Sequence, residues 1–455
     1  MIRPDSHSLL RIVATLLLSL AAALTVGGCQ EQLIATPYVM YGEAGKAVYA
    51  RVPETLRTSD LPVLYVTDRQ VKKETPQGPR YGYGRSPGME FGVATVSLGT
   101  DIAWDQLVAD STGSKRSRAY TPKVASVERT GGFASLVTRI RISDGRLTLP
   151  GESIQAVEDE QHNLDKLVDR WLDHSERKEA VIFIHGFNNS FDDAVIRLAE
   201  AWHFTGRQGV PVVFTWPAGS PGLLSYAQDR ESGEFANMHL KLLLVSLARN
   251  PKIEKIHIIS HSRGTDVATT ALRELHTEIR AGQGHSIFSW MLGLQPLPKP
   301  GSPEASRLTC DALKLQTLVL AAPDLDIEVF GQRFFGDNVL NVAKRVIIYL
   351  SNEDSALGLS DWLFSSKARV GNVDIKSFKP EFRAALAGLS DLEVINCKVS
   401  GGSSHSYVMQ HPAALSDLIL ALRECKDPGA ENGRPLAQPY KGVWQMDNSY
   451  LKPKE

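Results

Sequence analysis

Residues 256–272, with the sequence IHIISHSRGTDVATTAL, indicate a buried strand that passes through a tight turn into an amphipathic helix. A small-x-Ser-x-Gly arrangement at such a turn lifts the central serine above the sheet, and its small flanking residues let strand and helix approach closely. In the turn SHSRG (260–264), Ser262 is central and Ser260 occupies the place usually taken by glycine. We therefore expect Ser262 to act as a nucleophile; the alternative is that Ser262 or Thr265 only caps the helix.

On both sides of this turn, apolar segments that suit buried strands alternate with amphipathic segments that suit helices. The strands are expected at 180–188, 210–217, 255–260, 315–324, 344–354 and 392–401. The helices are expected at 152–175, 191–206, 234–249, 264–279, 326–343 and 411–425. Because short buried strands joined by helices form parallel sheets with both faces covered, we predict an α/β fold with a central, mostly parallel sheet and helices on both faces.

The segments before residue 150 are patterned less regularly. Strands are expected at 61–69 and 91–99, and a further strand at 136–142. Residues 77–89, QGPRYGYGRSPGM, are rich in Gly and Pro and are predicted to form a loop between the first two strands.

The chain has 455 residues, of which 43% are hydrophobic, enough for one large domain with a buried core. Its formal net charge of -1 gives no indication of a nucleic-acid partner. The expected parts are a signal peptide at 1–28, an N-terminal tether at 29–60, a catalytic domain at 61–425 and a C-terminal tail at 426–455 that wraps the surface or stays loose. Inserts at 281–311 and 355–390 interrupt the domain and are expected to form lids or binding loops.

The first residues of the chain differ in kind from the rest. Residues 12–26 form an almost unbroken apolar run, which is too short for a bilayer span and typical of a secretory signal. The run ends in VGGC (26–29), which resembles the lipobox of a bacterial lipoprotein precursor, so Cys29 is the expected site of lipidation and of membrane anchoring. By the same resemblance, Gln30 favours the outer membrane, facing the periplasm. The alternatives are a signal anchor and an ordinary cleavage site.

Three cysteines remain when Cys29 is lipidated: Cys310, Cys397 and Cys425. In an oxidising compartment an odd number indicates one disulfide and one free thiol, and we predict a Cys397–Cys425 disulfide. No spacing resembles a zinc site, and neither a metal nor an organic cofactor is expected.

A serine nucleophile needs a base and a third group that orients the base. When the serine sits at a strand-to-helix turn of this kind, an acid and then a histidine follow it along the chain. His405 lies in a Gly/Ser-rich loop and is favoured as the base over His411, which starts the last helix as a cap or surface residue. Asp354 ends a strongly apolar strand and is favoured as the acid, with Asp324 at the end of the preceding strand as the alternative.

The oxyanion formed by such an attack must be held by preorganised N–H groups, one of them on the residue after the nucleophile, which is Arg263. The segment FIHGFNNS supplies the second donor loop, with the backbone N–H of Phe187 or of Asn188 as the candidate. His185 in the same loop is expected to form structural hydrogen bonds.

Several segments together carry a resemblance to a known group: LYVTDR, FGVATVSLG, VIFIHGFNNSFDDA, VVFTWPAGS, HIISHSRG, LAAPDLD, YLSNEDSALGLS and HSYV. In order, and over residues 61–425, they resemble the α/β-hydrolase superfamily, and within it a bacterial esterase/lipase-like family of unknown function. The resemblance implies an α/β-hydrolase fold and a Ser-Asp-His triad, without an established substrate. Ser260 departs from the commonest turn of the superfamily, and the insert 281–311 is longer than the core requires, which leaves substrate preference open.

These observations predict a lipid-anchored serine hydrolase that cleaves carboxylic esters through an acyl-enzyme intermediate. Its expected partners are a small-molecule ester and, through Cys29, a membrane. The alternative is a non-catalytic envelope lipoprotein that uses a hydrolase fold as a binding scaffold, since fold does not determine function.

Overall fold

The computed structural model describes residues 32–135, 141–143, 146–148, 150–219, 225–281, 288, 291–293, 303–354, 369–374, 384, 386–399 and 405–453. The predicted signal peptide and lipidation site, residues 1–28 and Cys29, lie outside these residues, as do most of the inserts predicted at 281–311 and 355–390. Among the described helices, none is both long enough and apolar enough to cross a bilayer.

A mixed sheet forms the centre of the described structure, and it has 11 strands in the order β12-β13-β11-β10-β9-β8-β6-β7-β1-β2-β3. The parallel strands are β1 (Asp60–Thr75), β6 (Glu179–Ile184), β7 (Val210–Thr215), β8 (Lys255–His261), β9 (Leu315–Ala321), β10 (Arg345–Leu350), β11 (Leu392–Lys398) and β13 (Val443–Asp447). Antiparallel strands stand at the two edges: β2 (Gly78–Ser97), β3 (Lys123–Phe133) and β12 (Ala437–Tyr440). The predicted α/β architecture with a mostly parallel sheet is confirmed.

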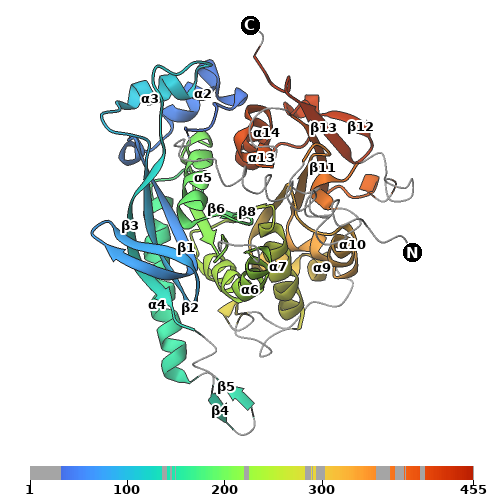
Figure 1. Ribbon diagram of the computed structural model, residues 1–455. Helices are drawn as coiled ribbons and strands as arrows, with labels where there is room; N and C mark the ends of the chain where they lie inside the picture. The colour runs from blue at the N-terminus through green and yellow to red at the C-terminus, as the bar shows by residue number, and fades with distance from the viewer. Residues whose placement is uncertain are drawn as a thin grey trace, which may run out of the picture.

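Helices cover both faces of this sheet (Figure 1). The described helices of eight or more residues are α2 (Gly42–Ala50), α3 (Trp104–Ser111), α4 (Gly151–Leu172), α5 (Phe191–Phe204), α6 (Ser225–Arg249), α7 (Gly264–Ala281), α9 (Pro303–Ala312) and α14 (Pro412–Arg423). On one face α6 and α7 pack against each other, and on the other face α5 and α14 enclose an apolar crevice. Every residue of β7 and of β10 is buried, because both faces of these strands are covered.

One predicted helix is broken into short pieces. Residues 326–343 form α10 (Ile327–Gly331), a π-helical turn η4 (Gln332–Gly336) and a 3-10 turn η5 (Val339–Val342). The break before η5 occurs at Asn338, whose φ of 64° is left-handed and incompatible with a continuous helix.

The predicted loop at 77–89 is wrong, because these residues belong to β2 and its hairpin with β1. The pairing of β1 with β2 contains three register shifts, and Gly and Pro are tolerated in such irregular strands. Strand β3 was not predicted. A small separate hairpin joins β4 (Arg141–Ser143) to β5 (Arg146–Thr148), at one end of the strand predicted at 136–142.

The segment predicted as a tether packs onto the domain over its described part, residues 32–60. The side chains of Leu33, Met40 and Tyr49 are buried. The backbone N–H of Leu33 donates to Tyr120 O at 2.8 Å. Apolar side chains at these positions favour burial over a loose connection.

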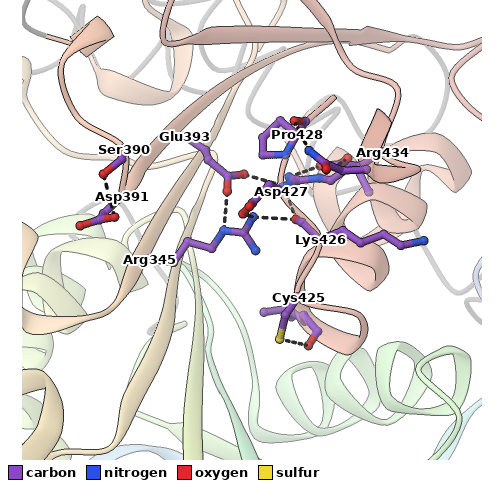
Figure 2. Close-up of polar contacts among 12 residues, drawn as sticks. Arg345, Ser390, Asp391, Glu393, Cys425, Lys426, Asp427, Pro428 and Arg434 are labelled. Atoms are coloured by element: carbon purple, nitrogen blue, oxygen red, sulfur yellow. Dashed lines mark hydrogen bonds and ion pairs between the residues drawn. The ribbon is translucent and has the colours of Figure 1, made fainter. Parts of the chain in front are cut away.

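The C-terminal segment also differs from the expectation of a loose or wrapping tail, because it adds β12 and β13 to the sheet. Arg434 is fully buried and donates to Asp417 of α14 at 2.8 Å and to Glu393 of β11 at 2.6 Å. Glu393 also pairs with Arg345 at the start of β10 (Figure 2). These buried ion pairs join the C-terminal segment to the centre of the fold.

The predicted disulfide between Cys397 and Cys425 is wrong, since Cys310, Cys397 and Cys425 are all free thiols. Cys397 is buried within β11, where it pairs in register with Met446 of β13. Cys425 is exposed after the end of α14. The two side chains therefore lie in different environments, one inside the sheet and one at the surface.

Candidate active site

The carboxyl ends of the parallel strands meet at one edge of the sheet, where open α/β sheets bind their ligands. Residues with polar or reactive side chains follow five neighbouring strands at this edge: His185 after β6, Trp216 after β7, Ser262 after β8, Asp324 after β9 and Asp354 after β10. Strand order therefore brings together residues that are far apart in the sequence.

Ser262 sits in a strained turn between β8 and α7. Its φ of 53° is left-handed, a conformation that non-glycine residues rarely adopt outside constrained sites. The turn is held by a hydrogen bond from Ser262 N to Ala321 O at 2.9 Å, and Ser262 O accepts from Asp324 N at 3.2 Å and from Thr265 N at 3.0 Å. Both Thr265 groups, N–H and hydroxyl, bond to Ser262 O, so Thr265 supports the turn.

Close approach of strand and helix at this turn explains its small residues. A Cβ added to Gly264 would lie 2.4 Å from His185 O, and one added to Gly186 would lie 2.7 Å from the Cβ of Ser262. Ser260 is fully buried, and its hydroxyl donates to Val319 O of the adjacent strand at 2.9 Å. Ser260 thus acts as a small packed residue, while Ser262 stands at the turn itself.

His405 and Asp354 are brought together by the fold. His405 Nδ1 lies 2.7 Å from Asp354 Oδ2, and since an ionised carboxylate only accepts hydrogen bonds, Nδ1 carries the proton. The Asp354 side chain is fully buried, whereas the His405 side chain is 20% exposed. Ser262 and His405 are both described, and no hydrogen bond joins them in this structure; such contacts are often loose before substrate binds.

A second histidine, His261, packs beside His405. The two rings are 4.9 Å apart, and His261 Nε2 donates to the backbone O of His405 at 3.1 Å. Burial, together with repulsion from His405, lowers the pKa of His261 to about 3. His261 is therefore neutral at physiological pH, and it holds the backbone of His405 without placing a positive charge beside that ring.

The two residues considered as alternatives have other partners. Asp324 Oδ2 accepts from the hydroxyl of Tyr226 at 2.8 Å, and Asp324 Oδ1 lies 3.4 Å from Arg369 Nε. His411 is the N-cap of α14, where its Nδ1 accepts from Ala413 N at 3.2 Å.

The loop after β6 carries one of the two predicted oxyanion donors, Phe187. Asn188 has a left-handed φ of 54°, and its N–H donates to Asp229 at 3.3 Å, so this N–H is already engaged. His185 donates from Nδ1 to Gly186 O at 2.9 Å and stacks on Trp216, with ring centroids 5.3 Å apart. Burial lowers the pKa of His185 well below its usual range, so it is a neutral structural residue.

Arg69, which lies in β1 just beyond the end of its parallel pairing with β7, was not singled out from the sequence. Its buried guanidinium donates to Thr215 Oγ1 at 2.8 Å, to Ala218 O at 3.0 Å and to Asn189 O at 2.7 Å. Burial lowers the pKa of Arg69 to about 10, so it stays charged near neutral pH. One side chain thus joins the loops that follow β6 and β7. The sequence did contain a signal for Arg69. The Asp-Arg pair in LYVTDR directly follows an apolar run, and charged residues seldom lie in a core.

Tyr226 and Asp229 were also missed, because both lie in the first turns of α6, which begins nine residues before the predicted helix at 234–249. Among the described residues, no group of His, Cys, Asp and Glu side chains is arranged to hold a metal ion.

Comparison with known proteins supports the fold. The model of a family described as alpha/beta hydrolase of unknown function (DUF900) matches residues 160–423. The chain belongs to this family. Ser262, Asp354 and His405 all fall within the matched range of this alpha/beta hydrolase family, whose description states no reaction. No curated protein and no solved structure matches the chain.

Proposed function

We propose that this alpha/beta hydrolase is a serine esterase, with Ser262 as the nucleophile, His405 as the general base and Asp354 as the residue that orients His405. The hydrogen bond of 2.7 Å between His405 and the buried Asp354 carries the proposal, because it lies at the same sheet edge as the strained turn of Ser262. This combination of groups is what an activated serine requires.

In the proposed reaction, Ser262 Oγ attacks the acyl carbon of an ester while His405 Nε2 takes the hydroxyl proton. The C–O bond to the alcohol then breaks, and His405 returns the proton to the leaving alcohol, which leaves an acyl-enzyme. Water, deprotonated by His405, attacks the acyl-enzyme and releases the acid and the free serine. The N–H groups of Arg263 and Phe187 are the proposed donors to the oxyanion.

The charges around His405 favour this role. Asp354 is close and shielded from water, so its negative charge stabilises the imidazolium that forms during the attack. The ring of His261 lies 4.9 Å from that of His405, and its neutrality avoids repulsion with that imidazolium.

Labelling with a fluorophosphonate tests the proposal directly, because an activated serine displaces fluoride and forms a stable phosphonyl ester. The wild type and Ser260→Ala should be labelled, and Ser262→Ala should not. Ser260→Ala is the matched control, since it removes a neighbouring buried hydroxyl of the same turn. A folded wild type that resists labelling would refute the esterase and leave the binding scaffold as the explanation of the fold. If the wild type is labelled, a series of p-nitrophenyl esters from short to long acyl chains would define the preferred acyl group.

We also propose attachment to the cell envelope through a lipid on Cys29, which rests on the sequence VGGC alone. The wild type should enter the detergent phase of a Triton X-114 partition, and Cys29→Ser should stay in the aqueous phase. Equal partition of the two proteins would contradict the lipid anchor.

A further inference from the structure

The first turn of α6 places Tyr226 against both of the residues proposed to hold the oxyanion. We propose that Tyr226 and Asp324 form a support that positions the N–H groups of Phe187 and Arg263, with Asp324 acting through Tyr226 rather than through His405. This inference rests on the proposed esterase function and assigns both side chains as positioning residues.

The tyrosine ring contacts the side chains of both donor residues. Its centroid is 5.3 Å from that of Phe187, and the guanidinium carbon of Arg263 lies 5.9 Å from the Tyr226 centroid. Phe187 follows β6 and Arg263 follows β8, so the two donors lie on different segments. A single rigid ring in contact with both restricts their relative movement.

Asp324 fixes this ring and the nucleophile turn at the same time. Its carboxylate accepts from the Tyr226 hydroxyl at 2.8 Å, and its backbone N–H donates to Ser262 O at 3.2 Å. Asp324 is 3% exposed, so the bond to Tyr226 is shielded from water. Asp324 therefore links Tyr226 to the backbone of Ser262. Through the tyrosine ring, the same link reaches Phe187 and Arg263.

The guanidinium of Arg263 is also held by an ion pair. Its guanidinium pairs with Asp266 at 2.6 Å, and Asp266 also pairs with Arg333 at 2.5 Å. With its guanidinium paired with Asp266 and packed against Tyr226, the side chain of Arg263 has little freedom to rotate. This restraint acts on the residue whose backbone N–H is the proposed oxyanion donor.

The same helical turn also holds the rest of the loop that carries Phe187. Asp229, three residues after Tyr226, accepts from Asn188 N at 3.3 Å and from Gly219 N at 2.9 Å. The loop is thus held to α6 at two adjacent residues: the ring of Phe187 contacts Tyr226, and the backbone N–H of Asn188 donates to Asp229. Preorganised donors of this kind need no rearrangement when the oxyanion forms, which is the source of their catalytic effect.

Steady-state kinetics on p-nitrophenyl acetate, normalised to active sites titrated with a fluorophosphonate, test the inference. Tyr226→Leu removes the ring and should lower kcat by about 10- to 100-fold with KM nearly unchanged, because loss of a whole oxyanion donor costs roughly 100- to 1,000-fold. Tyr226→Phe keeps the ring, and its kcat should fall less than that of Tyr226→Leu. A trifluoromethyl ketone, which forms an oxyanion on the serine, should bind to each variant more weakly by the same factor as the fall in kcat/KM.

Tyr120→Phe is the matched control, since it also removes a tyrosine–aspartate hydrogen bond, that of Tyr120 to Asp110 at 2.6 Å, in another part of the fold. It should alter neither kcat nor inhibitor affinity. Asp324→Asn keeps an acceptor for the Tyr226 hydroxyl. Its kcat should fall by no more than that of Tyr226→Phe, and its pH profile should be unchanged.

The outcomes separate this inference from the proposed function. If the wild type is labelled and turns over but Tyr226→Leu keeps its kcat and inhibitor affinity, the support role is refuted and the esterase stands. A loss of about 10,000-fold in Asp324→Asn, with an altered pH profile, would make Asp324 the triad acid and refute its role through Tyr226. A wild type without labelling would overturn both.

Discussion

The substitution Asp354→Asn tests the proposed mechanism most sharply, because it changes one buried atom of the pair with His405. An asparagine amide in this place can present an NH2 group to His405 Nδ1. The ring would then carry its proton on Nε2, where it could not accept the proton of Ser262. The substitution therefore keeps the volume of the side chain and removes both the charge and the tautomer that the reaction needs.

The geometry sets the size of the effect. At an effective dielectric constant of about 20, opposite unit charges separated by the observed 2.7 Å attract by about 6 kcal/mol. That attraction acts on the imidazolium in the transition state and is absent from the asparagine variant. Since each 1.36 kcal/mol corresponds to about tenfold in rate, kcat should fall by about 10,000-fold.

The assay is hydrolysis of p-nitrophenyl acetate across a range of pH, together with the rate of fluorophosphonate labelling. Both rates should fall in Asp354→Asn, while thermal unfolding should show that the variant folds. Asp324→Asn provides the comparison, because it makes the same chemical change at the end of the adjacent strand. Activity within tenfold of the wild type in a folded Asp354→Asn variant would refute the assignment of Asp354.

Three further substitutions test the packing and the charges of the fold. Gly186→Ala would place a Cβ 2.7 Å from that of Ser262 and should slow fluorophosphonate labelling by about 100-fold. The control Gly331→Ala adds a Cβ in open space and should leave the labelling rate unchanged. Equal rates in the two variants would contradict the close approach of Gly186 to Ser262. Arg434→Met removes the ion pair of the buried Asp417 and leaves Glu393 with Arg345 as its partner, so the free energy of unfolding in urea should fall by about 3–5 kcal/mol. A loss below about 1 kcal/mol would show that the ion pairs of Arg434 contribute little. Burial lowers the pKa of His276 from 6.5 to about 4, so the unfolded chain binds its proton first and stability falls as the pH drops below 6.5. About 2 kcal/mol should be lost between roughly pH 7 and 5, and urea unfolding of His276→Gln should lack that part of the loss.

The local patterns were sufficient for the central strands and for the turn of Ser262. Buried parallel strands are short apolar runs, and a small-x-Ser-x-Gly turn needs only neighbouring residues to form, so both leave a signal in consecutive positions. The predictions failed where no such signal exists. Residues 225–233 begin α6 with few apolar side chains, so no helical period marks them.

The predictions for three other segments were wrong for a related reason. The hairpin of β1 and β2 contains Gly and Pro that usually indicate a loop, yet its backbone is paired despite three register shifts. The segments 32–60 and 426–453 look peripheral, yet both pack onto the domain, the second through Arg434. Their positions depend on partners that lie far away in the sequence.

The sequence by itself determined the α/β fold, the turn that carries Ser262 and the small set of aspartates and histidines at the ends of later strands. Periodicity and turn chemistry are local properties, so they can be recognised from neighbouring residues. Only the tertiary structure decided the pairing, with Asp354 beside His405 and Asp324 beside Tyr226. Both aspartates follow adjacent strands at the same sheet edge, and a hydrogen bond depends on a separation of about 3 Å, which sequence spacing does not contain.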